Sequence, residues 1–330
     1  MNGYFNRKDL VYTVYQEKSI SKAAKKLFVS QPSLSIMLRK IEEEIGTPLF
    51  DRTSKPLRLT QAGQEYIKAT QAMLQIESAF EDYINAANEL MVGSLNVGGN
   101  QLLSSLVLHR YVSEFIQSYP NIRLNLTDDN SLALENMICD GQLDIVIDNH
   151  RLDDKLFVQR LWRTEHLLLA VPAGFACNKG VEQYQLSEED ILSGAYLAPG
   201  VKPVPLECFR DVPFVSMTRD NDTRRCADEI FREADITANT ILEIDRLVTL
   251  YNFIENGTAA SIVSDTLVQH MQHHAGKVVF YRLASARARR EIYVSYKRNR
   301  YYSKAMRVFV ELMFRIEEER ERPGGADKTN

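Results

Sequence analysis

Near the N-terminus the chain reads Ser21-Lys22-Ala23-Ala24-Lys25-Lys26-Leu27-Phe28-Val29-Ser30-Gln31-Pro32-Ser33-Leu34-Ser35. This pattern predicts two short helices joined by a tight turn. Ser21 is a suitable N-cap for the first helix, and Ala24 and Leu27 would face inward. Ser30 is a suitable N-cap for the second helix. The first turn of that helix tolerates Pro32, because the N–H that proline lacks would have no partner there.

The second helix is expected to continue to Ile45. Its apolar residues recur at spacings of four, three and four, which places Leu34, Leu38, Ile41 and Ile45 on one buried stripe. Gly46 supplies the C-terminal stop. Two short helices, the second with a polar leading end, form the helix-turn-helix pattern.

That pattern suits double-stranded DNA. A helix N-terminus carries a partial positive charge and free N–H groups for a phosphate. Gln and Ser side chains hydrogen-bond base edges in the major groove, and Arg reads guanine or holds a phosphate. The residues of this helix expected to contact DNA are Ser30, Gln31, Pro32, Ser33, Ser35 and Arg39.

Residues 47–60 follow as two short extended pieces around a polar turn, the pattern of a β-wing. Arg52, Lys55 and Arg58 are expected to lie along the DNA backbone. The alternative is that these charges only form a solvated face. The order of helix, turn and wing favours DNA and predicts a winged helix-turn-helix domain over residues 1–60.

Charge is distributed unevenly along the chain. Residues 1–60 hold eleven Lys and Arg against six Asp and Glu, a net charge of +5. The whole chain has a net charge of −4, so the other 270 residues carry −9. A basic head on an acidic body is expected when only one domain contacts phosphate.

The N-terminal stretch resembles the LysR-type transcriptional regulators of bacteria. The resemblance continues through Arg39-Lys40-Ile41-Glu42, Gly46-Thr47-Pro48-Leu49-Phe50-Asp51-Arg52 and Leu59-Thr60-Gln61-Ala62-Gly63. It implies a transcription regulator with a C-terminal effector-binding domain. One position departs from the family, since Ile36 stands where a basic or polar residue is usual. Ile36 would either contact a thymine methyl group or make no contact with DNA.

Residues 61–92 predict one long helix that links the head to the rest of the chain. Apolar residues recur seven apart in two registers, as in the a and d positions of a coiled coil. Tyr66, Met73, Ile76, Phe80 and Tyr83 are expected to pair two subunits in a homodimer or homotetramer. The alternative is an amphipathic helix packed on its own domain. The resemblance implies the pairing role.

Residues 93–330 change to an alternating α/β pattern. Strands are expected at 95–99, 122–126, 143–147, 167–171, 213–217 and 259–263, with helices at 102–117, 132–139 and 223–234. This order predicts two α/β lobes with a parallel or mixed sheet. The resemblance implies a fold like that of periplasmic solute-binding proteins, with lobe I over 93–166 and 267–300 and lobe II over 167–266. The whole chain therefore combines an α+β head with a two-lobed α/β domain.

Ligands of open α/β sheets bind at the carboxyl ends of the strands. The residues expected there are Asn100, Gln101, Leu102, Asn130, Ser131, Asn149, Thr218 and Asn221. They favour a small polar effector, and the nearby helix N-termini would suit an anion. The alternative is that these side chains serve only as caps and turns.

The sequence contains few signals of a metal site, an enzyme active site or a redox centre. His270-x-x-His273-His274 lacks the Cys or carboxylate that would complete a metal site, so a solvated helix end is favoured. The sequence has no G-x-S-x-G, P-loop, H-E-x-x-H or complete dinucleotide motif. We therefore expect no enzyme, cofactor or metal. The four cysteines lack a C-x-x-C pair and are expected to be reduced thiols, with a redox pair as the alternative.

No apolar run approaches the ~20 residues that cross a bilayer, and the N-terminus lacks the apolar core of a signal peptide. A cytoplasmic protein without membrane contact is expected. The sequence thus predicts a DNA-binding transcription regulator controlled by a small-molecule effector. The alternative is a small-molecule-binding protein whose DNA-binding head is vestigial.

Overall fold

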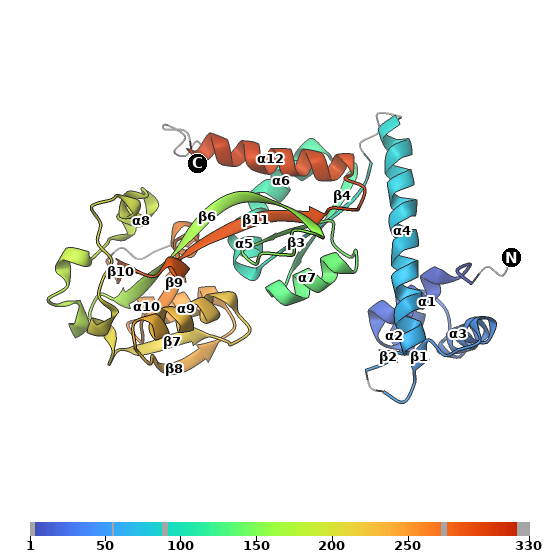
Figure 1. The fold of residues 1–330 in the computed structure, drawn as a ribbon, viewed down its shortest axis with the longest axis horizontal. Helices are drawn as coiled ribbons and strands as arrows, with labels where there is room; N and C mark the ends of the chain where they lie inside the picture. Colours follow the sequence, from blue (N-terminus) through green and yellow to red (C-terminus); the bar gives the residue numbers. More distant parts are fainter. Residues whose placement is uncertain (1–3, 55, 88–91, 272–275, 322–330) are drawn as a thin grey trace. The chain divides into compact units, whose positions relative to one another are not determined.

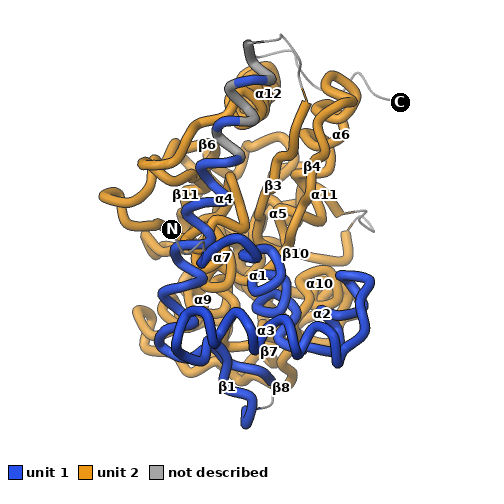
Figure 2. The backbone as a smooth tube through the Cα atoms, turned by 90° about the vertical axis from the view of Figure 1, so that its right-hand side faces the viewer, with its two compact units in different colours: residues 1–90 blue, residues 91–330 orange. Residues whose placement is uncertain are grey.

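The computed structural model describes residues 4–54, 56–87, 92–271 and 276–321. The chain divides into two compact units, Met1–Leu90 and Met91–Asn330 (Figure 2), each with its own hydrophobic core. None of the described helices combines the length and the apolar character that crossing a membrane requires.

The first unit contains short helices, a two-stranded wing and one long helix (Figure 1). These elements are α1 (Lys8–Glu17), α2 (Ile20–Lys26), α3 (Gln31–Ile45), β1 (Phe50–Asp51), β2 (Arg58–Leu59) and α4 (Gln61–Ala87). The predicted stripe of α3 faces the core, where Leu34, Leu38 and Ile41 are buried and Ile45 is half-buried. The strands of the wing are antiparallel, with Phe50 opposite Leu59.

The helix ends confirm two predicted signals and correct a third. Ser30 caps α3, because its Oγ accepts a hydrogen bond from Ser33 N at 3.2 Å. Gly46 ends α3 with φ +85°. The prediction that Ser21 caps α2 is wrong. Ser19 has the extended backbone that a cap needs and accepts from Lys22 N at 3.4 Å, so Ser21 lies inside the first turn.

The second unit is built on a mixed sheet. The spatial order of its strands is β10 (Val278–Arg282), β6 (Phe157–Pro172), β11 (Arg289–Lys297), β5 (Ile145–Asp148), β3 (Gly93–Gly99) and β4 (Ile122–Asp128). A seventh strand, β9 (Ser261–Ser264), also pairs with β6. β3 is parallel to β4 and β5, whereas β6 and β11 are antiparallel to their neighbours. A separate parallel pair, β7 (Pro213–Met217) and β8 (Asn239–Ile244), joins this sheet through a bridge between Phe214 and Ala260.

Strand β6 belongs to both lobes. Its first half pairs with β11 in lobe I and its second half pairs with β9 and β10 in lobe II (Figure 1). The predicted change of lobe after residue 166 falls within this strand. The predicted return at residue 267 is too early, because Leu267, Phe280 and Ala288 pack in the cores around the second half of β6. The chain returns to lobe I through β11.

Helices cover the sheets of both lobes. They are α5 (Gln101–Leu106), α6 (Leu108–Ser118), α7 (Ser131–Cys139), α8 (Glu188–Leu192), α9 (Asp222–Glu233), α10 (Leu247–Glu255), α11 (Asp265–His270) and α12 (Lys304–Glu321). Short 3₁₀ turns span Ala176–Asn178, Glu182–Tyr184, Ala195–Leu197, Leu206–Phe209 and Ala286–Ala288. The helix predicted over 102–117 is divided at Val107, which lies between α5 and α6 and is buried in the lobe I core.

Candidate functional site

The first nine residues of α3 present polar side chains on the surface of the head. Gln31, Ser33 and Arg39 are exposed, as is Pro32, and Ser35 is half-buried. The hydroxyls of Ser30 and Ser33 lie 2.7 Å apart, so these two predicted contact residues also hold the helix end together. The remaining side chains offer amide, hydroxyl and guanidinium groups, the set that reads base edges and phosphates.

A buried glutamate fixes the wing to α3. Glu42 Oε1 accepts hydrogen bonds from Leu49 N at 2.9 Å and Phe50 N at 3.2 Å, and Glu42 Oε2 lies 2.6 Å from Arg52 Nη2. The Arg52 side chain is 31% exposed, so part of its guanidinium is held inside the head. Glu42 carries no distinguishing signal in the sequence, because it lies among three consecutive glutamates and its partners come from the following loop.

The turn of the wing is organised by Asp51. Hydrogen bonds from the Ser54 hydroxyl and from the Thr53 hydroxyl and backbone N–H lower the pKa of Asp51 to about 2. Arg58, on β2, is exposed as expected. Lys55 lies outside the described residues.

The exposed apolar side chains of the head include Ile36 and Phe28. Ile36 is 57% exposed and directly follows Ser35, so it is accessible to a thymine methyl group. Phe28 is 96% exposed and occupies the left-handed backbone region with φ +55°, which large side chains rarely adopt. The exposure of Phe28 could not be predicted, because an aromatic residue in a tight turn carries no sequence signal of its exposure.

The long helix α4 carries an apolar stripe. Met73, Ile76, Phe80 and Ile84 are 37%, 70%, 65% and 42% exposed and follow one another at spacings of three or four residues. Tyr66 differs from them: it is 7% exposed, stacks on Phe5 and donates a hydrogen bond to Tyr4 O at 2.9 Å. Tyr66 therefore packs within the head. Tyr83 lies in α4, but its side chain is outside the described part of the chain.

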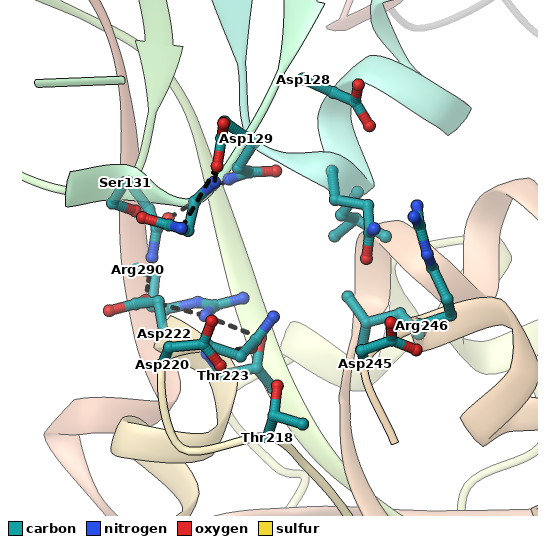
Figure 3. A pocket seen from close by; sticks show the side chains of 17 residues that line it. Asp128, Asp129, Ser131, Thr218, Asp220, Asp222, Thr223, Asp245, Arg246 and Arg290 are labelled. Atoms are coloured by element: carbon teal, nitrogen blue, oxygen red, sulfur yellow. Dashed lines mark hydrogen bonds and ion pairs between the residues drawn. The ribbon is translucent and has the colours of Figure 1, made fainter. Parts of the chain in front are cut away.

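A cavity of about 340 Å³ opens between the two lobes of the second unit (Figure 3). All eight predicted effector residues line it, namely Asn100, Gln101, Leu102, Asn130, Ser131, Asn149, Thr218 and Asn221. Three of the asparagines cap helices at its edge: Asn100 caps α5, Asn130 caps α7 and Asn221 caps α9. The capping interpretation therefore applies to these three asparagines, and they line the cavity as well.

A buried ionic network forms one wall of the cavity. Arg290 is 8% exposed; its Nη2 lies 2.6 Å from Glu165 Oε1 and its Nη1 lies 3.1 Å from Asp222 Oδ2. Asp222 also accepts a hydrogen bond from Asn149, which connects α9 of lobe II to the end of β5 in lobe I. The pair of Arg290 and Glu165 could not be predicted, because the two residues lie on different strands far apart in the chain.

Asp222 in this wall and Asp148, which accepts a hydrogen bond from the lining residue Asn100, have pKa values shifted in opposite directions. Burial raises the pKa of Asp148, although its hydrogen bonds from Ser131 and Asn100 oppose the shift. Burial would also raise the pKa of Asp222, but the Arg290 guanidinium and the Asn149 amide outweigh it and lower that pKa. Asp222 is therefore a carboxylate at neutral pH.

Among the described residues, no group of His, Cys, Asp and Glu is arranged to hold a metal ion. His270 is half-buried, with Nδ1 2.9 Å from Thr266 O, and burial lowers its pKa. His273 and His274 lie outside the described residues. The four cysteines, Cys139, Cys177, Cys208 and Cys226, are free.

The chain is similar in sequence and in structure to known regulators. Residues 88–315 match the family model of the LysR substrate binding domain, and residues 6–64 match that of the bacterial regulatory helix-turn-helix proteins of the lysR family. The uncharacterized HTH-type transcriptional regulator YcgK of Bacillus subtilis (strain 168) is 24% identical over 91% of this chain and 90% of its own length.

Solved structures of similar architecture cover nearly all of the chain. A full-length OxyR variant from Pseudomonas aeruginosa has a TM-score of 0.66 at 19% identity and covers 93% of this chain and 91% of its own. Full-length CbnR complexed with its target DNA has a TM-score of 0.58 at 20% identity, covering 93% and 98% of the two chains. The likeness of the fold and the two family models agree, and the chain belongs to the LysR family of transcription regulators, with a helix-turn-helix head and an effector-binding domain.

Proposed function

We propose that the protein controls transcription as a cytoplasmic homodimer or homotetramer that responds to a small molecule. In this proposal residues 1–60 bind double-stranded DNA, residues 61–92 pair subunits and residues 93–330 bind the effector. The main observation behind this proposal is that all eight predicted effector residues line one cavity. In the head, helix α3 exposes Gln31 and Arg39. The size of the cavity fits the range of small-molecule sites.

The exposed apolar stripe of α4 supports pairing between subunits. A helix that exposes Met73, Ile76 and Phe80 on one side gains stability when a second helix covers them. A paired protein would present two α3 helices to two half-sites, as symmetric helix-turn-helix proteins do. We omit Tyr66 from the proposed interface, because its ring is used inside the head.

The DNA contacts of α3 and the wing are tested by a mobility-shift assay on fragments flanking the protein's own gene. Arg39→Ala should weaken binding about tenfold and, if Arg39 contacts a phosphate, reduce the slope of affinity against salt by about one. Arg232→Ala is the matched control, since it removes the same charge from an exposed side chain of the second unit. The control should bind like the wild type.

The same assay separates the proposal from its alternative. If the wild-type protein binds none of these fragments at low salt while its cavity binds a metabolite, the head is vestigial. The filled core of the head and its net charge of +5 oppose that alternative. A vestigial head would not be expected to retain the Glu42–Arg52 pair that fixes the wing.

The effector would act through the contacts that join the lobes. Asn149 and Asp222 come from opposite lobes and meet at the cavity wall. A ligand that binds one arrangement of the lobes more tightly than the other shifts the population by that difference in affinity. DNA affinity changes only if the favoured arrangement also alters the paired heads.

A further inference from the structure

The cavity between the lobes is lined by more acidic than basic side chains. Its charged lining residues are Asp128, Asp129, Asp220, Asp222, Asp245, Arg246 and Arg290. Figure 3 shows the carboxylates on different sides of the space rather than gathered at one point. The charge of the ligand can therefore be inferred from which of these groups remain available to it.

Arg290 and Asp222 are already neutralised by the protein. Arg290 contacts Glu165 and Asp222, and Asp222 also lies 2.7 Å from Arg225 Nη2. Two guanidinium groups thus face two carboxylates in one network. A ligand anion would have to compete with the buried Glu165 for Arg290, so this arginine is a poor anion site.

Four carboxylates and one guanidinium of the cavity lining remain available to a ligand. Among the described residues, no ion pair involves Asp128, Asp129, Asp220 or Asp245. Helices α5, α7, α9 and α10 begin at the cavity. At about half a charge each, their N-termini and Arg246 supply roughly three positive charges against four negative ones. The net charge of these groups is therefore negative. An anionic effector, expected from the helix N-termini alone, is not favoured by this balance.

The hydrogen-bonding groups of the wall also favour a ligand that donates hydrogen bonds. The side-chain oxygen of Asn100 accepts a hydrogen bond from a backbone N–H of α5, and its nitrogen donates to Asp148. In the same way Asn130 accepts from a backbone N–H of α7 and donates to Asp129. Asn149 accepts from Asn100 and donates to Asp222. The aspartates at the mouth of the cavity retain carboxylate oxygens for a ligand, and a carboxylate can only accept. The complementary ligand is a donor.

A metal ion does not fit this arrangement. The described carboxylates are not close enough together to form a metal-binding group, and the cavity is far larger than a bare ion. We infer that the effector is a small organic cation with amino or guanidinium groups at more than one position. This inference rests on the proposed function, since it assumes that the cavity is the effector site.

The test is isothermal titration calorimetry of the full-length protein without DNA. The probes are α,ω-diamines of three to six carbons and agmatine, with dicarboxylates of matched length as the opposite charge. We expect at least one amine to bind and the matched dicarboxylate not to bind. Asp220→Asn and Asp245→Asn should each weaken the amine about tenfold, the effect of one charged hydrogen bond. Asp211→Asn is the control, because Asp211 is exposed and does not line the cavity.

The inference is overturned if dicarboxylates bind as tightly as diamines, or if no amine binds at about 1 mM, the weak end of specific affinity. Ser131→Trp, which fills the cavity, separates this failure from failure of the proposed function. A dicarboxylate that binds the wild type but not Ser131→Trp would keep the cavity as the effector site and remove only its cation preference. Amine binding that survives Ser131→Trp would place the ligand elsewhere and also sink the inference. Thermal unfolding checks that each variant is folded.

Discussion

At Gly63 the backbone of α4 passes against the loop before the wing. A Cβ added there would lie 2.0 Å from the carbonyl oxygen of Leu49, a backbone atom that cannot swing aside. Leu49 is fully buried and its N–H is held by Glu42, so the loop has little freedom to retreat. The close approach of two backbones therefore requires glycine at this position.

We predict that Gly63→Ala destabilises the head by about 1–3 kcal/mol, the usual cost of forcing atoms into a packed core. Amide hydrogen exchange in residues 34–50 of the full-length protein should accelerate accordingly. Gly174→Ala is the matched control, since no atom lies within 4 Å of the added Cβ. Unchanged exchange in Gly63→Ala would show that the loop moves aside freely.

Asp51 makes the turn of the wing sensitive to acid. Its pKa of about 2 lies below the ordinary value, because Ser54 and Thr53 hydrogen-bond the charged form. A lowered pKa means that the folded wing is stabilised above about pH 4 and loses that contribution as the pH falls toward 2. We predict that Ser54→Ala, which removes the largest cause, raises the pKa of Asp51 toward its ordinary value. NMR titration of the carboxyl carbon measures it, and an unchanged pKa would contradict the assigned hydrogen bond.

At the scale of whole elements, the stripe on α4 makes the clearest prediction. Ile76 is 70% exposed and lies near the centre of the stripe. Ile76→Glu would place a carboxylate in the proposed contact between two helices, where burying an unpaired charge is costly. We predict a shift toward smaller assemblies in sedimentation equilibrium, with the dissociation constant raised more than about tenfold.

Gln64→Glu is the control for that variant. Gln64 is exposed on the opposite side of α4 at 3.6 residues per turn, and the substitution adds the same charge. It should leave the assembly unchanged. Equal effects of the two variants would mean that added charge, and not the stripe, controls association.

Elements with a strong local pattern could be predicted from the sequence. Helix α3 was identifiable because one stripe of apolar residues, the Ser30 cap and the Gly46 stop agree. The first half of β6 was not identified, since its charged residues Arg163 and Glu165 interrupt the apolar pattern that marks a buried strand. Such charges are tolerated there only because partners such as Arg290 arrive from elsewhere in the chain.

In the cavity, too, features with a local sequence pattern could be predicted, and features that depend on distant partners could not. The rule that ligands bind at strand ends identified eight of the lining residues, because these ends are visible as breaks in the strand pattern. The number of lining aspartates without an ion pair among the described residues was not identified from the sequence. It depends on which aspartates are already paired, and the pairs join residues that only the fold brings together, such as Asp222 with Arg290.

At the scale of the whole molecule, regulation requires that the effector cavity and the DNA-binding head be coupled. Coupling between two binding events is reciprocal: if the effector changes DNA affinity by some factor, DNA changes effector affinity by the same factor. Typical couplings are about 5–150-fold, large enough to measure in both directions.

We therefore predict equal factors from two titrations of the full-length protein. In the first, operator DNA is titrated with and without the effector; in the second, the effector is titrated with and without operator DNA. Arg39→Ala should bind the effector with wild-type affinity when DNA is absent, because Arg39 lies in the head and not at the cavity. Unequal factors in the wild type would mean that the effector or the DNA binds at more than the proposed site. A factor of one in both directions would mean that the cavity does not control the head.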